Sequence, residues 1–163
     1  MGILVRLLTD LDRRRRHRGA ARAVRNLLPE PESWLDVATG DAAFPETARR
    51  LFPYTSFDGT DPTPRVAHAQ AEEKVEMAYV GPLTHPHIAT AVRSRYDVVT
   101  LLHTPASREE LRTAVTALRP SGLLLVETPC ANALRTELES QGCQILSSKT
   151  RRLVARRVPA TPR

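Results

Sequence analysis

Aromatic residues, lysine and cysteine are all scarce in this chain of 163 residues. Phe, Trp and Tyr together make up 4% of the sequence, which leaves few rings for the stacking platforms on which proteins hold nucleic-acid bases. Cys130 and Cys143 form neither a metal-binding spacing nor a disulfide framework, so we expect free thiols in a reducing cytoplasm. His68, His85 and His87 show no metal-ligand spacing either, and no metal site is expected.

Long apolar runs are absent as well. No stretch approaches the roughly 18 apolar residues that a membrane-spanning helix needs. The short N-terminal run Ile3–Leu8 is interrupted by Arg6, unlike a signal peptide. The sequence therefore predicts a cytoplasmic protein with no membrane partner.

Arginine, by contrast, is abundant. The formal net charge is +6 and the isoelectric point is about 10.1, yet Lys74 and Lys149 are the only lysines. A polyanionic partner would explain this charge, but an arginine bias beside many alanines and prolines is also typical of a GC-rich genome. The densest run, Asp12–Arg18, is interpreted either as an anion- or RNA-binding arm or as a solvated stretch between two helices. We favour the second interpretation, because charge blocks are often merely exposed.

Hydrophobic patterning predicts a single α/β domain over residues 1–163, with a helical segment at 1–30 and a core at 33–158. Strands are expected at 34–37, 56–60, 75–80, 96–103, 123–129, 143–148 and 153–158, and helices at 45–51, from 62 onward, at 87–95, from a capping box at 107–110 to a stop at 119–122, and at 131–141. This alternation predicts a mainly parallel, doubly wound sheet with helices on both faces and an antiparallel C-terminal hairpin. Such a sheet binds its ligand at the carboxyl ends of the strands, where strand order reverses.

The stretch Trp34–Phe44 is the most informative part of the sequence. It is typical of a short strand followed by a turn of small residues and a helix, which lets a ligand approach the backbone closely. Asp36 lies inside the strand, where a charge is costly without a partner. Asp61 follows Gly40 by about 20 residues, the spacing of an acid that binds a nucleoside ribose. The dinucleotide fingerprint G-x-G-x-x-G is not met, so an ordinary α/β connection is the alternative interpretation.

Four stretches resemble, in order, the motifs of the class I S-adenosylmethionine-dependent methyltransferases. They are Leu35–Asp41 (LDVATGD), Phe57–Asp61 (FDGTD), Tyr96–His103 (YDVVTLLH) and Ala117–Val126 (ALRPSGLLLV). The expected C-terminal hairpin is also similar to that of the family, in which the seventh strand is antiparallel and inserted before the sixth. The resemblance covers residues 33–158 and implies a Rossmann-like fold.

The resemblance implies S-adenosylmethionine as the cofactor and S-adenosylhomocysteine as its product. The residues that it assigns to the cofactor are Asp36, Ala38, Thr39, Gly40, Asp61, Leu83 and His103. Asp36 would orient the turn and approach the cofactor's amino group, and residues 38–40 would pass beneath its methionine and ribose. Asp61 would accept the ribose hydroxyls, Leu83 would flank the adenine, and His103 would face the methyl-donor pocket.

His103 is also the candidate catalytic residue, as a general base toward an acceptor hydroxyl. A strand-end histidine that hydrogen-bonds a loop is the equal alternative. The chain departs from the family at Ala42, which replaces the third glycine of the first motif, and at Pro129, which runs almost directly into the last helix with no inserted cap. A site without a cap implies a large acceptor, a cap lent by a second subunit, or lost catalysis. Glu127 is interpreted as the partner of a nearby arginine rather than as an acceptor-site acid.

The function predicted from these features is methyl transfer to an unidentified acceptor, a small molecule of secondary metabolism. One alternative is a degenerate methyltransferase fold that binds a partner protein or serves another reaction such as a cyclisation. Another is a nucleic-acid methyltransferase or binder, which the net charge suggests and which predicts salt-dependent affinity for nucleic acid. A homodimer or a partner protein that covers the open site is also considered.

Overall fold

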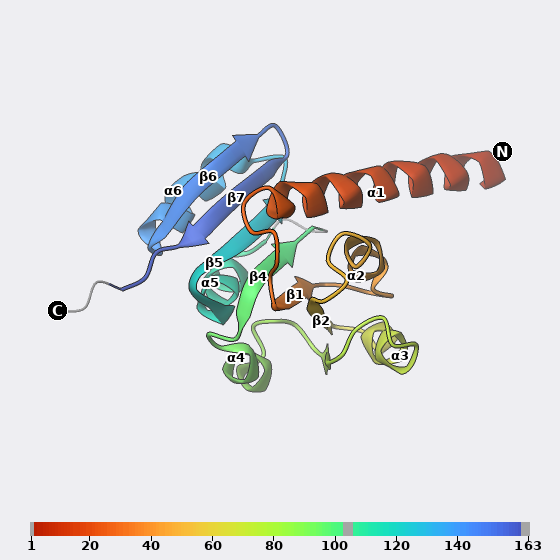
Figure 1. Cartoon of the computed structure of the whole chain (residues 1–163), viewed down its shortest axis with the longest axis horizontal. Helices are drawn as coiled ribbons and strands as arrows, with labels where there is room; N and C mark the ends of the chain where they lie inside the picture. The colour runs from red at the N-terminus through yellow and green to blue at the C-terminus, as the bar shows by residue number, and fades with distance from the viewer. Residues whose placement is uncertain (1, 103–105, 161–163) are drawn as a thin grey trace.

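We describe residues 2–102 and 106–160 of a computed structural model of the chain, with the backbone alone for residues 2–4. The strands in these ranges are β1 (Ser33–Val37), β2 (Ser56–Asp61), β3 (Ala78–Val80), β4 (Tyr96–Leu101), β5 (Leu118–Glu127), β6 (Cys143–Lys149) and β7 (Arg152–Arg157). They form one sheet in the order β3-β2-β1-β4-β5-β7-β6 (Figure 1). Neighbouring strands are parallel except where β7 pairs with β5 and β6. The predicted Rossmann-like sheet with its antiparallel C-terminal strand is confirmed.

Strand order reverses between β1 and β4, which lie side by side at the centre of the sheet. The chain first runs outward from β1 to β2 and β3, and then crosses back to β4 and runs outward in the other direction. In sheets of this kind, ligands bind beyond the carboxyl ends of the strands at such a reversal. The turn that follows β1 is therefore the place to look for a site.

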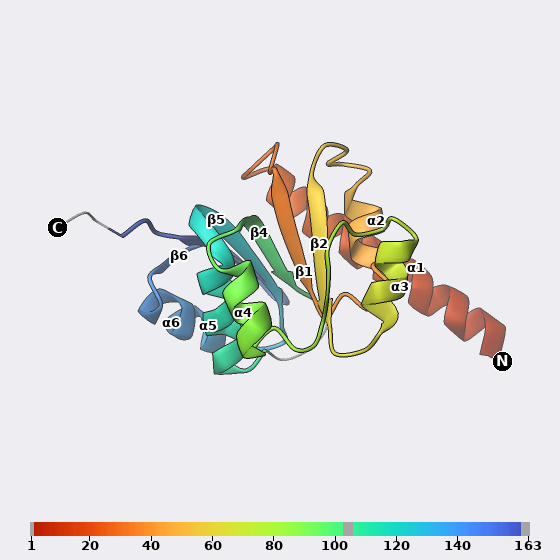
Figure 2. The ribbon, with the colours of Figure 1, turned by 90° about the horizontal axis from the view of Figure 1, so that it is seen from below.

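Helices cover both faces of the sheet (Figure 2). The helices of the described ranges are α1 (Gly2–Arg25), α2 (Ala43–Ala48), α3 (Arg65–Ala71), α4 (Pro86–Val92), α5 (Arg108–Ala117) and α6 (Ala131–Ser140). Trp34 packs with Phe44 of α2 in one buried cluster, and its neighbour Leu35 packs with Leu111 of α5 in another. Successive side chains of a strand point to opposite faces, so β1 contributes to both halves of the core.

The central strands form because their residues suit burial on both faces. β4 and the second half of β5 are near-continuous runs of leucine, valine and threonine, and almost all of these residues are buried. Such runs are typical of parallel strands with helices on both sides. At the start of α5, the Oγ of Ser107 accepts a hydrogen bond from the backbone amide of Glu110 at 3.1 Å, as the capping pattern predicts.

The arginine-rich run lies inside one continuous helix, so the expectation of two helices with a solvated stretch between them is wrong. Arginine is a good helix former. Two ion pairs, Arg13 with Asp10 at 3.1 Å and Arg16 with Asp12 at 3.4 Å, also support the helix there. The N-terminal half of α1 extends past α2 (Figure 1). Its exposed apolar side chains are Val5, Leu7, Leu8 and Leu11.

The predicted stop of α5 at residues 119–122 is wrong in one respect, because these residues belong to β5. The helix ends at Ala117, and Leu118 already pairs with Tyr96 of β4. The next pair joins Leu123 to Val98, so the intervening residues of β5 bulge out of the ladder, and Ser121 takes a φ of 68°.

None of the helices in the described ranges is both long enough and apolar enough to span a membrane.

Candidate functional site

The turn after β1 is built from small residues in left-handed conformations. The φ angles of Ala38, Gly40 and Ala42 are 54°, 58° and 61°. At Gly40 a Cβ would also lie 2.9 Å from Nη2 of Arg65, so an added side chain would require this exposed guanidinium to move. Ala42 is fully buried in a cluster with Val66 of α3, so its methyl group packs into the core. The turn therefore brings bare backbone to the carboxyl edge of the sheet at Gly40.

Asp36 holds this turn to the neighbouring strand. Its carboxylate is fully buried, with Oδ2 accepting a hydrogen bond from the Thr39 hydroxyl and Oδ1 one from the Thr100 hydroxyl, each at 2.7 Å. The Thr100 hydroxyl in turn accepts from the indole of Trp34 at 3.2 Å. These hydrogen bonds offset the cost of removing the carboxylate from water. Asp36 thus links the turn to β4 across the strand reversal.

Asp61, the last residue of β2, faces the same turn. Its Oδ2 accepts from the backbone amide of Gly40 at 2.8 Å, and its Oδ1 accepts from the amide and hydroxyl of Thr63 at 2.9 and 2.5 Å. Burial alone would raise the pKa of Asp61, but these hydrogen bonds and the charge of Arg65 outweigh it and hold the pKa below its ordinary value. A carboxylate offers about four acceptor positions, so this one has capacity left for a ligand hydroxyl.

A cavity of about 360 Å³ opens over the turn and Asp61. Its lining residues are Arg13, His17, Ala38, Thr39, Gly40, Asp41, Ala43, Asp61, Pro62, Thr63 and Arg65. The volume lies within the range of small-molecule and cofactor sites. Two of these residues, Arg13 and His17, come from α1, which therefore covers part of the site. The helical spacing of His17 with Ala20, Ala21 and Val24 could have placed this histidine on the buried face of α1.

The structure brings together most, but not all, of the residues predicted to bind the cofactor. Ala38, Thr39, Gly40 and Asp61 line the cavity, and Asp36 lies directly behind it. The catalytic candidate, His103, lies outside the described residues.

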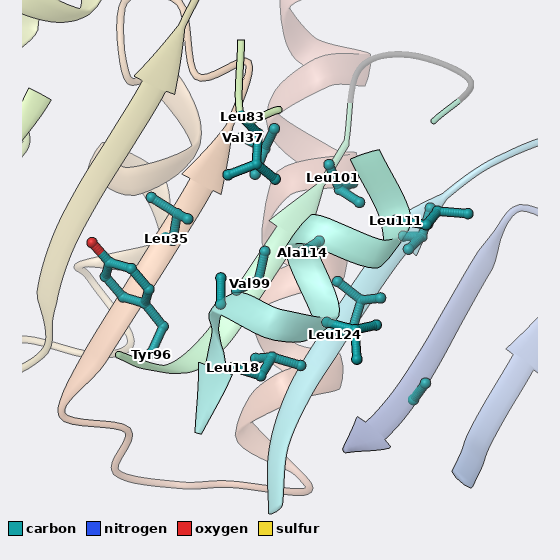
Figure 3. Close-up of a cluster of buried hydrophobic side chains, with 14 of the residues drawn as sticks. Leu35, Val37, Leu83, Tyr96, Val99, Leu101, Leu111, Ala114, Leu118 and Leu124 are labelled. Carbon is teal, nitrogen blue, oxygen red and sulfur yellow. The ribbon is translucent and has the colours of Figure 1, made fainter. Parts of the chain in front are cut away.

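Leu83 is placed in the core rather than on the cavity wall. Its side chain is 1% exposed and lies against Val37 in the cluster that also holds Leu101 (Figure 3). Leu83 is close to the carboxyl ends of β1 and β4, but it does not line the cavity. Its proposed contact with adenine stays a prediction.

Other candidate residues have local structural roles. Glu127 pairs with Arg152 at 2.8 Å, as expected from its position near the end of β5. His85 and His87 stack on each other with ring centroids 5.7 Å apart, and both are exposed. Within residues 2–102 and 106–160, no group of three or more His, Cys, Asp or Glu side chains is arranged to hold a metal ion.

Comparison with known proteins identifies the family. A family model described as a methyltransferase domain matches residues 11–156. The chain belongs to this methyltransferase family. Members of the family use S-adenosylmethionine, and several similar structures contain this cofactor or S-adenosylhomocysteine. No curated protein matches the chain significantly.

Three solved methyltransferases illustrate the likeness of fold. The 1,6-didemethyltoxoflavin N1-methyltransferase of Burkholderia thailandensis, with 1,6-didemethyltoxoflavin and S-adenosylhomocysteine bound, is 15% identical with a TM-score of 0.69 over 88% of this chain and 78% of that one. The amino pentose methyltransferase CalS10 of Micromonospora echinaspora is 17% identical, with a TM-score of 0.66 over 93% and 97%. A putative O-methyltransferase of Nostoc punctiforme is 18% identical, with a TM-score of 0.63. The matched region covers 87% of this chain and 56% of that one.

The residues around the turn fit the family's cofactor. The bare backbone at Gly40 allows a ligand to approach closely. The lowered pKa of Asp61 keeps its carboxylate ionised, so it can accept a hydrogen bond from a ribose hydroxyl. Both residues line the same cavity. The guanidinium of Arg65 is close to Gly40, but it belongs to an exposed side chain that can move. Ala42 stands where the family motif has a glycine. Its methyl group does not narrow the cavity, because it packs in the cluster with Val66.

Proposed function

We propose that this chain is a cytoplasmic methyltransferase that moves a methyl group from S-adenosylmethionine to a small-molecule acceptor. The observation that carries the proposal is the hydrogen bond between the Gly40 amide and Asp61, which holds the turn and the acid side by side in the wall of one cavity. Two free cysteines, Cys130 and Cys143, support a reducing compartment.

The turn and Asp61 would hold the cofactor. In this proposal, Asp61 accepts a hydrogen bond from a ribose hydroxyl with its remaining lone pair, and residues 38–40 lie beneath the methionine and ribose. Asp36 keeps the turn in register with β4 through Thr39 and Thr100, and it is the candidate partner of the cofactor's amino group.

Positioning would supply much of the catalysis. The bound cofactor provides a sulfonium methyl group that is already a good electrophile, so the chain has to orient an acceptor for in-line attack. An acceptor hydroxyl would also need a proton acceptor. His103 remains the proposed base, and His17 is a second imidazole that lines the cavity.

A small acceptor is supported by the shape of the site. α1 places Arg13 and His17 over the cavity, so part of the missing cap comes from the chain itself. The similar structures include one methyltransferase crystallised with 1,6-didemethyltoxoflavin and another that acts on an amino pentose. A second subunit or a partner protein would cover the rest of the opening.

One observation favours a second candidate, a partner-binding protein without methyl transfer. From residue 5 onward, where side chains are described, the projecting end of α1 exposes four aliphatic side chains, each more than half exposed. These are Val5, Leu7, Leu8 and Leu11. Exposed apolar side chains gathered at one helix end are typical of an interaction surface. This candidate predicts that the protein folds but binds neither S-adenosylmethionine nor S-adenosylhomocysteine.

Calorimetric titration with both ligands separates the two candidates. We expect micromolar binding by the unaltered protein, a loss of at least tenfold in Asp61→Ala, and no change in Glu109→Ala, a control at an exposed acid of α5. Circular dichroism confirms that each variant is folded. Absence of binding by a folded, unaltered protein would favour the partner-binding candidate.

A further inference from the structure

A second cavity, of about 200 Å³, adjoins the cofactor cavity. It lies between α1 and α2, and it shares Arg13, His17, Asp41 and Ala43 with the first cavity. The basic side chains around it are Arg13, Arg14, Arg18, Arg50 and Lys74. This second cavity is called the basic cavity below.

The basic cavity carries positive charge that the chain leaves partly unbalanced. Among the described residues that line it, Asp41 and Glu46 are the only acids. Among the residues that the structure describes, no carboxylate lies within ion-pair distance of Arg14, Arg18 or Arg50. Guanidinium groups bind carboxylates and phosphates in paired hydrogen bonds. A polar pocket with three such free groups therefore favours a small anionic group.

The three arginines do not belong to the cofactor cavity. Of the basic residues, Arg13 and Arg65 line that cavity, while Arg14, Arg18 and Arg50 line the basic cavity alone. An anion held by these three would therefore lie beside the cofactor rather than be part of it.

His17 marks the boundary between the two cavities. It lines both of them, its side chain is 3% exposed, and its ring meets that of Phe44 edge-on with centroids 5.5 Å apart. A molecule anchored in the basic cavity would extend past His17 to reach the cofactor cavity. The anchor and the point of reaction would then be at opposite ends of one acceptor.

We infer that the methyl acceptor carries a carboxylate or phosphate group, which Arg14, Arg18 and Arg50 bind in the basic cavity while the rest of the acceptor reaches toward the cofactor cavity. This inference rests on the proposed function. A volume of about 200 Å³ suits one small anionic group rather than a nucleic-acid strand. A nucleic acid bound through general charge is an outcome that the test must be able to show.

The test uses protein saturated with S-adenosylhomocysteine and followed by NMR titration. Benzoate and inorganic phosphate serve as anionic probes, and benzamide is the neutral counterpart of benzoate. We expect at least one anion to bind, with benzamide at least tenfold weaker than benzoate if benzoate is the probe that binds. The triple variant Arg14→Gln, Arg18→Gln, Arg50→Gln is expected to weaken anion binding at least tenfold.

The matched control is Arg22→Gln. Arg22 is an exposed arginine on the same helix that lines neither cavity. It should change anion affinity less than twofold, and neither variant should change the affinity for S-adenosylhomocysteine more than twofold. Because the substituted arginines are exposed, we expect the triple variant to fold. The single variant Arg50→Gln provides a milder second test, with an expected loss of anion affinity of at least threefold.

Three results would overturn the inference. One is that neither anion binds the saturated protein. A second is an equal loss in Arg22→Gln together with salt-sensitive binding of a single-stranded RNA, which would mean attraction by net charge. A third is competition between the anions and S-adenosylhomocysteine, which would assign the basic cavity to the cofactor's own carboxylate.

Failure of the proposed function is seen separately, in the titration with S-adenosylhomocysteine itself. If that ligand does not bind, the anion titrations are made on the unliganded protein. Binding that the triple variant loses and Arg22→Gln keeps would still support an anion site in the basic cavity. Absence of such binding would overturn it.

Discussion

The backbone amide of Gly40 donates a hydrogen bond of 2.8 Å to Oδ2 of Asp61. This contact joins the turn after β1 to the end of β2, two points about 20 residues apart in the chain. It uses one acceptor position of the carboxylate, Thr63 uses two more through Oδ1, and about one of the four positions is left for a ligand in the cavity. The geometry of the proposed cofactor site therefore depends on both residues together.

Asp61→Asn is expected to weaken S-adenosylhomocysteine binding at least tenfold, or about 1.4 kcal/mol. The amide retains a similar shape but removes the negative charge that strengthens the hydrogen bond from a ribose hydroxyl. Calorimetry of both proteins tests this expectation. Glu109→Gln, at an exposed acid of α5 far from the cavity lining, is the matched control. Equal binding by Asp61→Asn would contradict the assignment.

The depressed pKa of Asp61 predicts how stability changes in acid. Because the pKa in the folded state lies below the ordinary value of 3.8, the ionised carboxylate stabilises the fold above pH 3.8, and this contribution is lost as the pH falls through the folded-state pKa. Urea unfolding between pH 2 and pH 6 should therefore show a steeper acid loss in the unaltered protein than in Asp61→Asn. S-adenosylhomocysteine affinity should not change between pH 5 and pH 8 through this group. A change in affinity centred in that range would point to another titrating residue.

Asp58 predicts the opposite pH dependence. Its carboxylate is 4% exposed and accepts from the Tyr96 hydroxyl at 2.6 Å and from the Met77 amide at 3.1 Å. Burial raises the pKa of Asp58 above 3.8, and the hydrogen bonds from Tyr96 and Met77 only partly oppose the rise. The stabilisation is therefore present below pH 3.8 and is lost as the pH rises through the raised pKa.

Asp58→Asn should remove this loss of stability above pH 3.8. The amide is neutral at every pH and can still accept from Met77. Unfolding free energies measured at several pH values should thus fall less, from pH 4 upward, in the variant than in the unaltered protein. Parallel curves would mean that the Asp58 carboxyl titrates alike in the folded and unfolded states.

The sequence predicts the turn after β1 and its place at the carboxyl edge of the sheet, because the residues that form the turn are close together in the chain. A strand, a turn of small residues and an acid at a fixed spacing form a local pattern, and the structure brings Thr39, Gly40 and Asp61 to one cavity. The partnership of Asp36 with Thr100 depends on the register of β1 against β4. Two parallel runs of apolar residues pair equally well in several registers, so the sequence alone does not determine this contact.

The contribution of α1 is the main feature that sequence patterns do not predict. The arginine run has the composition of a solvated segment, and nothing in it specifies where the helix passes over the sheet. In the structure, Gly19 lies against the guanidinium of Arg152. A Cβ added at Gly19 would be 3.3 Å from Nη1 of that arginine. Arg152 of β7 also donates a hydrogen bond of 3.3 Å to the backbone carbonyl of Arg16, a residue 136 positions away in the chain.

The two alanines of the turn should respond differently to glycine. Ala38 and Ala42 both have left-handed φ angles, which cost a residue with a Cβ about 1–2 kcal/mol. Ala38→Gly relieves this strain at the expense of greater freedom in the unfolded chain, for a net gain of up to about 1 kcal/mol. Ala42→Gly also removes a fully buried methyl group, worth about 0.8 kcal/mol, so it should give no gain. Urea unfolding of both variants makes the comparison.

Gly40→Ala is the matching disruptive change. It combines a left-handed φ with a contact of 2.9 Å to Arg65, and it should lower stability by about 1–2 kcal/mol from the backbone alone. It should also weaken S-adenosylhomocysteine binding at least tenfold, because the methyl group is added between two residues that line the cavity, Gly40 itself and Arg65. The double variant Gly40→Ala, Arg65→Ala removes the contact but keeps the strain. Full recovery of binding in the double variant would show that the cofactor does not approach Gly40 closely.

Leu83→Ala separates a core role from an adenine contact. Leu83 is 1% exposed and packs with Val37 and Leu101, so truncation should cost about 2–5 kcal/mol of unfolding free energy. If burial is its main role, the folded variant should bind S-adenosylhomocysteine within about threefold of the unaltered protein. A loss of affinity of tenfold or more would instead support the adenine contact that the family resemblance implies. Leu138→Ala, at a similarly buried site on α6, is the control for a loss of stability far from the cavity. The affinities are compared at a temperature where both variants remain folded.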